Sequence, residues 1–189
     1  MIILVATGSA VLRCDADRGT MTPASGLADE RPTCLCADAG VPGRAWCGTH
    51  RGGVFCSDDA GASWHPVGLG DLRITAISAS PVDAGVVLVG TEPSEVWRSD
   101  DAGATWRRTS RLDELPSSTE WSFPPRPDTH HVRWIACHPQ RPGRLWVAVE
   151  AGALITTKDG GVRGRTVSRA GRTTRTSCRS ILRHRTRCA

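Results

Sequence analysis

The chain has 189 residues, which is the size of one ordinary domain and is long enough to bury a core. Its formal net charge is +5, from 24 Lys and Arg against 19 Asp and Glu. Nine of the Arg lie between residues 163 and 189, so residues 1–162 carry 15 positive and 19 negative charges, or −4. This acidic body argues against nucleic-acid binding, and no apolar run approaches the ~20 residues of a membrane span. We therefore expect neither nucleic acid nor membrane as a partner.

The chain opens with MIILVATGSAV, a short apolar run without a basic flank. This pattern is typical of a first β-strand rather than a signal peptide, so we expect a cytoplasmic protein. The residues that follow, VLRCDADRG, predict the end of a repeat unit and carry a degenerate turn motif at 14–19.

A motif of the form Ser/Thr-x-Asp-x-Gly then recurs three times. It lies in GVFCSDDAGASW at 53–64, EVWRSDDAGATW at 95–106 and ALITTKDGG at 153–161, and the first two copies continue with x-x-Trp. The step from the second copy to the third is longer than the first step, because a Pro- and Ser-rich insertion occupies about 107–133. The motif residues are Ser57, Asp59, Gly61, Trp64, Ser99, Asp101, Gly103, Trp106, Thr157, Asp159 and Gly161.

Each motif is preceded by two short apolar runs around a turn rich in Pro, Gly and Asp. A unit therefore reads as strand, turn, strand, turn, strand, motif turn and strand, which predicts antiparallel β structure. The number of residues from Ser57 to Ser99 is the period of the repeat. This period falls within the range of about 40–45 residues that is typical of four-stranded propeller blades. We predict an all-β fold over residues 1–162, an incomplete β-propeller with about three four-stranded antiparallel blades and part of another.

The motif residues have a physical role within their own turn. The carboxylate of Asp59 can accept hydrogen bonds from nearby backbone N–H groups, and Ser or Thr can do the same. Gly61 supplies a backbone conformation that a Cβ atom would resist, and Trp64 buries a large ring beside the next strand. The equivalent residues of the other copies are expected to act alike.

On these motifs the chain resembles the BNR or Asp-box propellers over about residues 1–162. This group includes sialidases, xyloglucan-active glycosidases and photosystem II assembly-factor-like proteins. The resemblance implies that the motifs, called Asp boxes below, lie in hairpin turns at the periphery and are structural. A sialidase of this kind needs a Tyr nucleophile and an Arg-Ile-Pro signature near its start, whereas this chain contains no Tyr. The chain is therefore not expected to be a complete sialidase.

The segment 163–189 departs from the repeat pattern. The third Asp box should end in Trp at position 164, but Gly164 begins a stretch of Arg, Thr and Ser without strand alternation. With GC-rich codons, a shifted reading frame can spell WEDRVP, which restores the Trp, and later a copy resembling DTHHVRWIACHPQRPGRLW at 128–146. We predict a basic, disordered, non-native tail produced by a frameshift; a natural basic tail is the alternative.

A propeller interrupted in this way cannot close its ring, which normally needs ~4–8 blades. An unclosed fan leaves strand edges unpaired and one blade face bare. We therefore expect poor solubility, with aggregation or self-association through the open blade edges.

A glycosidase would need a pair of carboxylates on either side of the scissile bond. Outside the Asp boxes the candidates are Glu92, Glu95, Asp113, Glu114, Glu120, Asp128 and Glu150. We expect most of them to be solvated loop charges. Glu150 is singled out because VAVEAGAL places a charge where the other blades have Thr49 and Thr91.

The insertion before the third Asp box is the strongest candidate for a ligand site, because long loops on a rigid scaffold often carry function. It concentrates aromatic, Arg and His side chains that suit carbohydrate or peptide recognition. Adjacent His residues in a strand point to opposite faces, so a shared metal is not expected. Packing over the propeller is the alternative role. The candidate ligand-binding residues are Trp121, Phe123, Arg126, Asp128, His130, His131 and Glu150.

The eight Cys residues are expected to be free thiols. Cys34 and Cys36 form a C-x-C without a second pair, which is a poor zinc signal, and no phosphate-binding loop is present. We therefore expect no metal and no cofactor. The function predicted is a non-catalytic binding or assembly scaffold for a protein or carbohydrate partner. The alternative is a glycoside hydrolase of sialidase or xyloglucanase type, inactive in this truncated form.

Overall fold

The computed structural model describes residues 1–109, 112, 115, 117–121, 130–150, 152–161 and 165–169. Within these residues the fold is built from four antiparallel sheets, and a short 3-10 turn lies at Ser118–Glu120. No helix in this part of the chain is long and apolar enough to cross a membrane. The predicted all-β architecture is therefore confirmed.

The sheets follow one another along the chain, and neighbouring strands pair in sequence order. The first sheet holds β1 (Ile2–Ala6), β2 (Val11–Asp15) and β3 (Thr20–Pro23). The second holds β4 (Pro32–Ala37), β5 (Ala45–Thr49), β6 (Val54–Ser57) and β7 (His65–Gly68). The third holds β8 (Arg73–Ala79), β9 (Val87–Glu92), β10 (Val96–Ser99) and β11 (Arg107–Arg108). The fourth holds β12 (Val132–Cys137), β13 (Leu145–Val149), β14 (Ala153–Thr157) and β15 (Arg165–Arg169).

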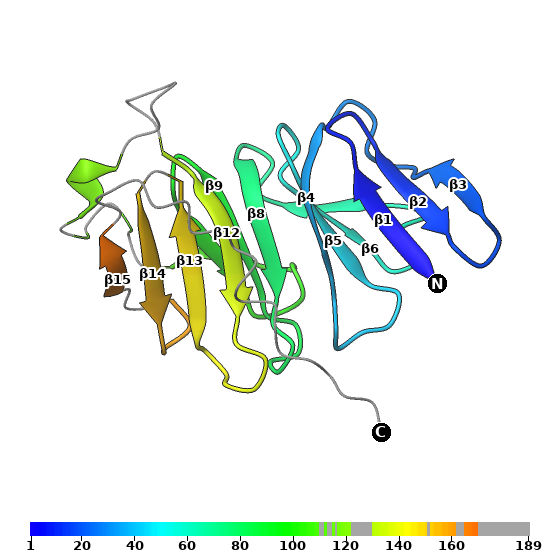
Figure 1. The fold of residues 1–189 in the computed structure, drawn as a ribbon. Helices are drawn as coiled ribbons and strands as arrows, with labels where there is room; N and C mark the ends of the chain where they lie inside the picture. The colour runs from blue at the N-terminus through cyan, green and yellow to red at the C-terminus, as the bar shows by residue number, and fades with distance from the viewer. Residues whose placement is uncertain are drawn as a thin grey trace.

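The four sheets stand beside one another as a fan (Figure 1). Strand β4 packs against β8, and β8 packs against β12, so the first strands of the second, third and fourth sheets form a continuous inner layer. The first sheet joins the fan through contacts of β1 with β4. We call β4, β8 and β12 the inner strands.

The strand register repeats with the sequence period. Gly48 pairs with Val54 in the second sheet, and Gly90 pairs with Val96 in the third. In each inner strand one residue bulges out of register at the same place, at Thr33, Thr75 and Arg133. Residues at equivalent positions of the sequence repeat therefore have equivalent partners in the sheets.

The first sheet is one strand shorter than the others, and the period tells which strand is missing. Thr7, immediately after β1, lies one period before Thr49, at the end of β5. Likewise Cys14 in β2 lies one period before Cys56 in β6. Strand β1 is thus the counterpart of β5, and the first sheet has no counterpart of an inner strand among the described residues.

A separate apolar layer fills each gap between neighbouring sheets. Val11, Leu35, Cys47, Phe55 and Trp64 pack between the first and second sheets. The layer between the second and third sheets contains Trp46, Val54, Ile74, Ile77 and Val87. The layer between the third and fourth sheets contains Leu88, Val96, Val132, Ile135 and Val147, together with Leu112 and Trp121 from the insertion.

The inner strands approach their neighbours closely where the facing residue is Gly. A Cβ atom on Gly48 would lie 2.5 Å from Cγ2 of Ile74, and one on Gly90 would lie 2.3 Å from Cγ1 of Val132. Glycine at these two positions therefore sets how closely the sheets stack.

The segment predicted as a disordered tail is ordered at its start. Residues 165–169 form β15, which pairs with β14 as the fourth strand of the fourth sheet. The prediction of disorder is thus wrong for these five residues, because they supply the hydrogen-bonding partner that the edge of β14 needs. Residues 170–189 lie outside the described residues.

Candidate functional site

The Asp boxes form tight turns whose polar side chains bind the turn's own backbone. Oγ of Ser57 donates to Asp59 at 2.8 Å and accepts from the N–H of Gly61 at 2.9 Å. Oδ1 of Asp59 also accepts from the N–H groups of Ala62 and Ser63, each at 2.9 Å. The box of the third sheet repeats the geometry, with Ser99, Asp101 and Gly103 in the same arrangement, as does the box of Thr157, Asp159 and Gly161.

The boxes also contact the preceding sheet. The indole N–H of Trp106 donates to the carbonyl oxygen of Val67 in β7 at 2.8 Å. A Cβ atom on Gly61 would lie 2.3 Å from Leu4 in β1.

The hydrogen bonds of Ser63 to the carboxylate lower the pKa of Asp59 to about 2. Thr105 lowers that of Asp101 to about 2 in the same way.

A second set of polar residues recurs at the end of the blades where the inner strands begin. Arg31 and Arg73 come immediately before or at the start of β4 and β8, and His131 comes immediately before β12. His50, Glu92 and Glu150 lie at or immediately after the ends of β5, β9 and β13. We call these six residues, Arg31, His50, Arg73, Glu92, His131 and Glu150, the inner rim.

Two pairs of the inner rim are joined by close contacts between their polar side chains. Nη1 of Arg73 lies 2.8 Å from Oε2 of Glu92, whose side chain is only 8% exposed. Nε2 of His131 lies 2.6 Å from Oε2 of Glu150, and Nε of Arg133 lies 4.0 Å from the same oxygen. Each pair therefore ties an inner strand to the second strand of its own sheet.

His50 extends the rim into the second sheet. Its backbone N–H donates to the carbonyl oxygens of Glu30 and Arg31 at 3.2 and 3.0 Å. Burial lowers the pKa of the His50 imidazole, and the nearby positive charges of Arg73 and Arg31 lower it further. His50 thus favours the neutral imidazole between two sheets that each contribute an Arg.

Trp121 from the insertion lies beside this end of the fourth sheet. Its ring is buried, and it meets the ring of His130 edge to face with centroids 5.5 Å apart. A Cβ atom on Gly152 would lie 3.0 Å from Cγ of Trp121, so the ring covers the hairpin between β13 and β14. The indole Nε1 is buried and has no hydrogen-bond acceptor among the described residues.

The predicted ligand-binding residues are thus only partly brought together. Trp121 contacts His130, and His131 binds Glu150. Phe123, Arg126 and Asp128 lie outside the described residues, as do Asp113, Glu114 and the side chain of Glu120.

The predicted position of Glu150 is wrong by one residue. Thr49 pairs with Pro32 and Thr91 pairs with Ile74, and the residue in the same register of the fourth sheet is Val149, which pairs with Val132. Glu150 corresponds instead to Glu92 and His50. Val149 is buried in the same apolar cluster as Trp121.

Sequence reasoning missed Arg31, His50 and Arg73 as site residues, and treated Glu92 only as one of several carboxylates. A signal was present, because Arg31 and Arg73 are one period apart, as are His50 and Glu92. His131 and Glu150 then follow Arg73 and Glu92 by the longer step that separates the second and third Asp boxes. The period therefore identifies the rim once it is applied to polar residues at strand ends as well as to the Asp boxes.

One cluster has the ligand types of a metal site. Cys56, Asp58 and His65 bring one ligand atom each within 4.8 Å of one another. However, Nε of Arg44 lies 2.6 Å from Asp58, and burial raises the pKa of Cys56 to about 11. A zinc ligand must be a thiolate, so this arrangement favours an ion pair beside a neutral thiol.

The equivalent positions of the third sheet hold a set of salt bridges. Arg98, Asp100 and Arg107 occupy the equivalent positions there, and the carboxylate of Asp100 binds both Arg side chains.

The six described Cys residues are all free thiols, and burial raises the pKa of Cys34 to about 11.

No protein-family model matches the chain, and no curated protein matches it. Solved structures do. An ancestral GH74 enzyme matches with a TM-score of 0.70 and 14% identity, covering 90% of this chain and 23% of that chain. The GH74 xyloglucanase from Xanthomonas campestris matches with a TM-score of 0.65 and 19% identity, covering 91% and 29%.

YCF48 from Cyanidioschyzon merolae matches with a TM-score of 0.56 and 20% identity, covering 74% of this chain and 38% of that chain. YCF48 bound to D1 peptide matches with a TM-score of 0.54 and 16% identity, covering 88% and 43%. This chain spans less than half the length of each of these proteins. At these identities the likeness establishes the fold: the four sheets are blades of a β-propeller.

Proposed function

We propose that this chain is a non-catalytic scaffold that binds a protein or carbohydrate partner, and that the inner rim is its contact surface. The observation that carries the proposal is the recurrence of charged and imidazole side chains at one end of three successive blades. Propellers host many unrelated functions, so the side chains of this site, and not the fold, support the proposal.

The chemistry of the rim suits recognition of polar groups. The exposed guanidinium groups of Arg31 in the inner rim and of Arg133, which lies beside Glu150, can bind carboxylate or carbonyl oxygens, because Arg presents several donors in a fixed plane. Trp121 and His130 add aromatic surface at the fourth blade. The YCF48 structure that contains D1 peptide makes a peptide partner reasonable for this fold.

A glycoside hydrolase of xyloglucanase type is the competing proposal, because GH74 enzymes share the fold. Hydrolysis needs two carboxyl groups that face each other across the substrate. Within the described rim, Glu92 is bound by Arg73 and Glu150 by His131. Each of these carboxylates is therefore engaged by a donor of its own blade rather than paired with a second carboxylate across a cleft.

The test compares binding with hydrolysis on the same samples. We expect the chain to bind a subset of immobilised peptides or oligosaccharides, and the variant Arg31→Glu with Arg133→Glu to bind them at least tenfold more weakly. The control is Arg18→Glu, an exposed Arg in the turn between β2 and β3 of the first blade, which should bind like the parent. Release of reducing sugar from xyloglucan or of sialic acid from sialosides would overturn the non-catalytic proposal.

One further property belongs to this proposal. The uncovered faces at the two ends of the fan lead us to propose that the chain self-associates.

A further inference from the structure

The blades differ in how the charges of the inner rim are compensated. In the third blade the carboxylate of Glu92 binds Arg73, and Glu150 occupies the same position in the fourth blade. The second blade has His50 at this position, one period before Glu92. Arg31, which corresponds to Arg73, therefore has no carboxylate opposite it in its own blade.

Two exposed Arg side chains flank His50. Arg31 comes immediately before β4, and Arg51 follows His50 in the hairpin between β5 and β6. Neither forms an ion pair within the part of the chain that the structure describes. Oγ1 of Thr49 accepts from the N–H of Gly52 at 2.9 Å and so closes the hairpin, which fixes Arg51 beside the imidazole.

One carboxylate lies close to these cations. A Cβ atom on Gly52 would lie 2.2 Å from Oε2 of Glu30, which places this carboxylate against the hairpin. The two Arg and the one Glu give this part of the rim a net charge of +1, and protonation of His50 raises the net charge to +2.

His50 is the group whose charge can change here. Its Nδ1 is buried and has no hydrogen-bond partner among the described residues. Burial lowers the pKa of the imidazole, Arg73, Arg31 and Arg51 lower it further, and Glu92 raises it. A negative charge placed among these guanidinium groups would offset them and would favour the protonated imidazole.

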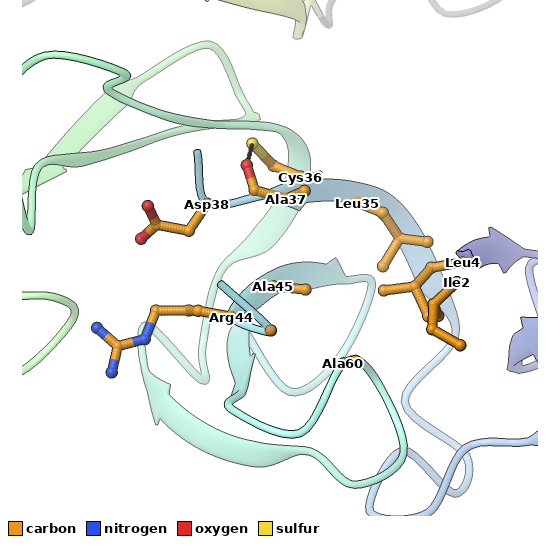
Figure 2. A pocket seen from close by; sticks show the side chains of 10 residues that line it. Ile2, Leu4, Leu35, Cys36, Ala37, Asp38, Arg44, Ala45 and Ala60 are labelled. Atoms are coloured by element: carbon orange, nitrogen blue, oxygen red, sulfur yellow. Dashed lines mark hydrogen bonds between the residues drawn. The ribbon is translucent and has the colours of Figure 1, made fainter. Parts of the chain in front are cut away.

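The Arg at the other end of β5 shows the contrast. Arg44 comes immediately before β5, and its Nε lies 2.6 Å from Oδ1 of Asp58. Figure 2 shows its side chain pointing away from Leu4 and Leu35, which line a cavity of about 390 Å³ between the first and second sheets. This Arg is compensated by a carboxylate of its own blade, unlike the two that flank His50.

We propose that Arg31, His50 and Arg51 bind a tetrahedral oxyanion with two negative charges, of the phosphate-monoester class, and that His50 takes up a proton as the anion binds. This inference rests on the function proposed above, because it names the chemical group that a partner presents to the inner rim. A dianion balances the two positive charges that the site holds once His50 is protonated, whereas a carboxylate balances the single charge already there. The fixed planar donors of Arg suit phosphate oxygens.

The first experiment titrates the whole chain with inorganic sulfate at constant ionic strength and follows NMR chemical shifts. Sulfate stays a dianion between pH 5.5 and pH 8, whereas a phosphate monoester itself titrates near pH 6. We expect saturable binding that is about tenfold tighter at pH 5.5 than at pH 8, because anion binding and protonation strengthen each other by the same factor. Methanesulfonate, a similar tetrahedral ion with one negative charge, should bind more weakly and without this pH dependence.

Substitutions locate the site. His50→Gln should leave at pH 5.5 the affinity that the parent has at pH 8, because the titrating group is gone. Arg31→Gln with Arg51→Gln should weaken sulfate binding about tenfold at both pH values. His65→Gln and Arg44→Gln are the matched controls and should bind like the parent, since His65 is exposed at the start of β7 and Arg44 is already bonded to a carboxylate.

The parent chain decides if these variants fail to fold. The pKa of His50, followed through the NMR signals of its ring, should rise when sulfate is added, and an unchanged pKa would overturn the proposal. Phosphoserine and glucose 6-phosphate, each compared with its unphosphorylated form, distinguish a peptide source of the phosphate from a sugar source. At least one of them should bind through its phosphate.

Three other results would overturn the proposal: no saturable binding at millimolar sulfate, a pH dependence that survives in His50→Gln, or methanesulfonate that binds as tightly as sulfate. The function proposed above fails separately. If immobilised peptides or oligosaccharides still bind through the inner rim while sulfate does not, the anion site is wrong and the contact surface stands. If none of these ligands binds, both proposals are wrong.

Discussion

At the scale of single residues, the carboxylate of Asp59 accepts four hydrogen bonds within its own turn. Asp59 accepts from two backbone N–H groups and from the hydroxyls of Ser57 and Ser63. These bonds favour the ionised form, so the pKa of Asp59 falls from 3.8 to about 2. The depressed pKa contributes stability that is present above pH 3.8 and is lost as the pH falls toward 2.

Asp59→Asn should lower the free energy of unfolding by about 1 kcal/mol, because an amide nitrogen cannot accept the bond from the Ser63 hydroxyl. Urea unfolding at pH 7 measures this loss. The variant should also lose less stability than the parent between pH 4 and pH 2, since the group that titrates is gone.

Asp58→Asn is the matched control. Asp58 is the adjacent, exposed carboxylate, and it is bonded to Arg44 in an exposed ion pair, which is worth ~0–1 kcal/mol. If both variants lose the same stability and show the same acid dependence, the hydrogen bonds of Asp59 are not what holds the turn.

At the scale of elements, the inner strands determine how closely the blades stack. The glycines facing them, Gly48 and Gly90, leave no room for a Cβ atom, whereas the same place in the fourth sheet holds Ala148. Ala148 pairs with Leu154 on the face where no further blade packs among the described residues. This position therefore holds Gly where a neighbouring blade packs against it, and Ala where none does among the described residues.

Gly90→Ala should destabilise the protein by about 1–3 kcal/mol, because the new methyl group would meet the buried, β-branched Val132. Thermal or urea unfolding monitored by Trp fluorescence measures the change. Gly70→Ala serves as the control, since nothing lies within 4 Å of its Cβ position. Equal stability of the two variants would show that the third and fourth blades do not stack as tightly as described.

Prediction from sequence was most successful at this scale. The alternation of apolar runs and turns located the strands, because each strand and its turn are specified within about ten residues. The register failed at Glu150, since a shift of one residue at the end of β13 leaves the local pattern unchanged. Only the pairing of Val149 with Val132 distinguishes the two alignments.

At the scale of the whole molecule, the fan ends in two partly apolar faces. The outer side of the first sheet presents Ile3, Val5 and Met21 with 45%, 41% and 64% of their surface exposed. The far side of the fourth sheet presents Trp134 with 41% exposed. Between blades, the equivalent faces are buried, so these surfaces favour association with apolar partners.

We expect the parent chain to self-associate at micromolar concentration in sedimentation velocity, and the variant Ile3→Lys with Val5→Lys to shift toward the monomer. Lys at these two positions places charge on the apolar outer face, and burying that charge against another chain is unfavourable. Val82→Lys is the control, because Val82 is 40% exposed but lies in a turn away from both end faces. A parent chain that is monomeric throughout would contradict the prediction.

The sequence by itself determined the repeat, the Asp boxes and the number of blades, because the hydrogen bonds of Ser57, Asp59 and Gly61 close within one short turn. The frameshift origin of residues 163–189 stays a prediction. The tertiary structure decided the rest. It paired Arg73 with Glu92, and it placed His50 near Arg31 and Arg73. These contacts join segments that local pattern does not connect, since they depend on which blades lie side by side.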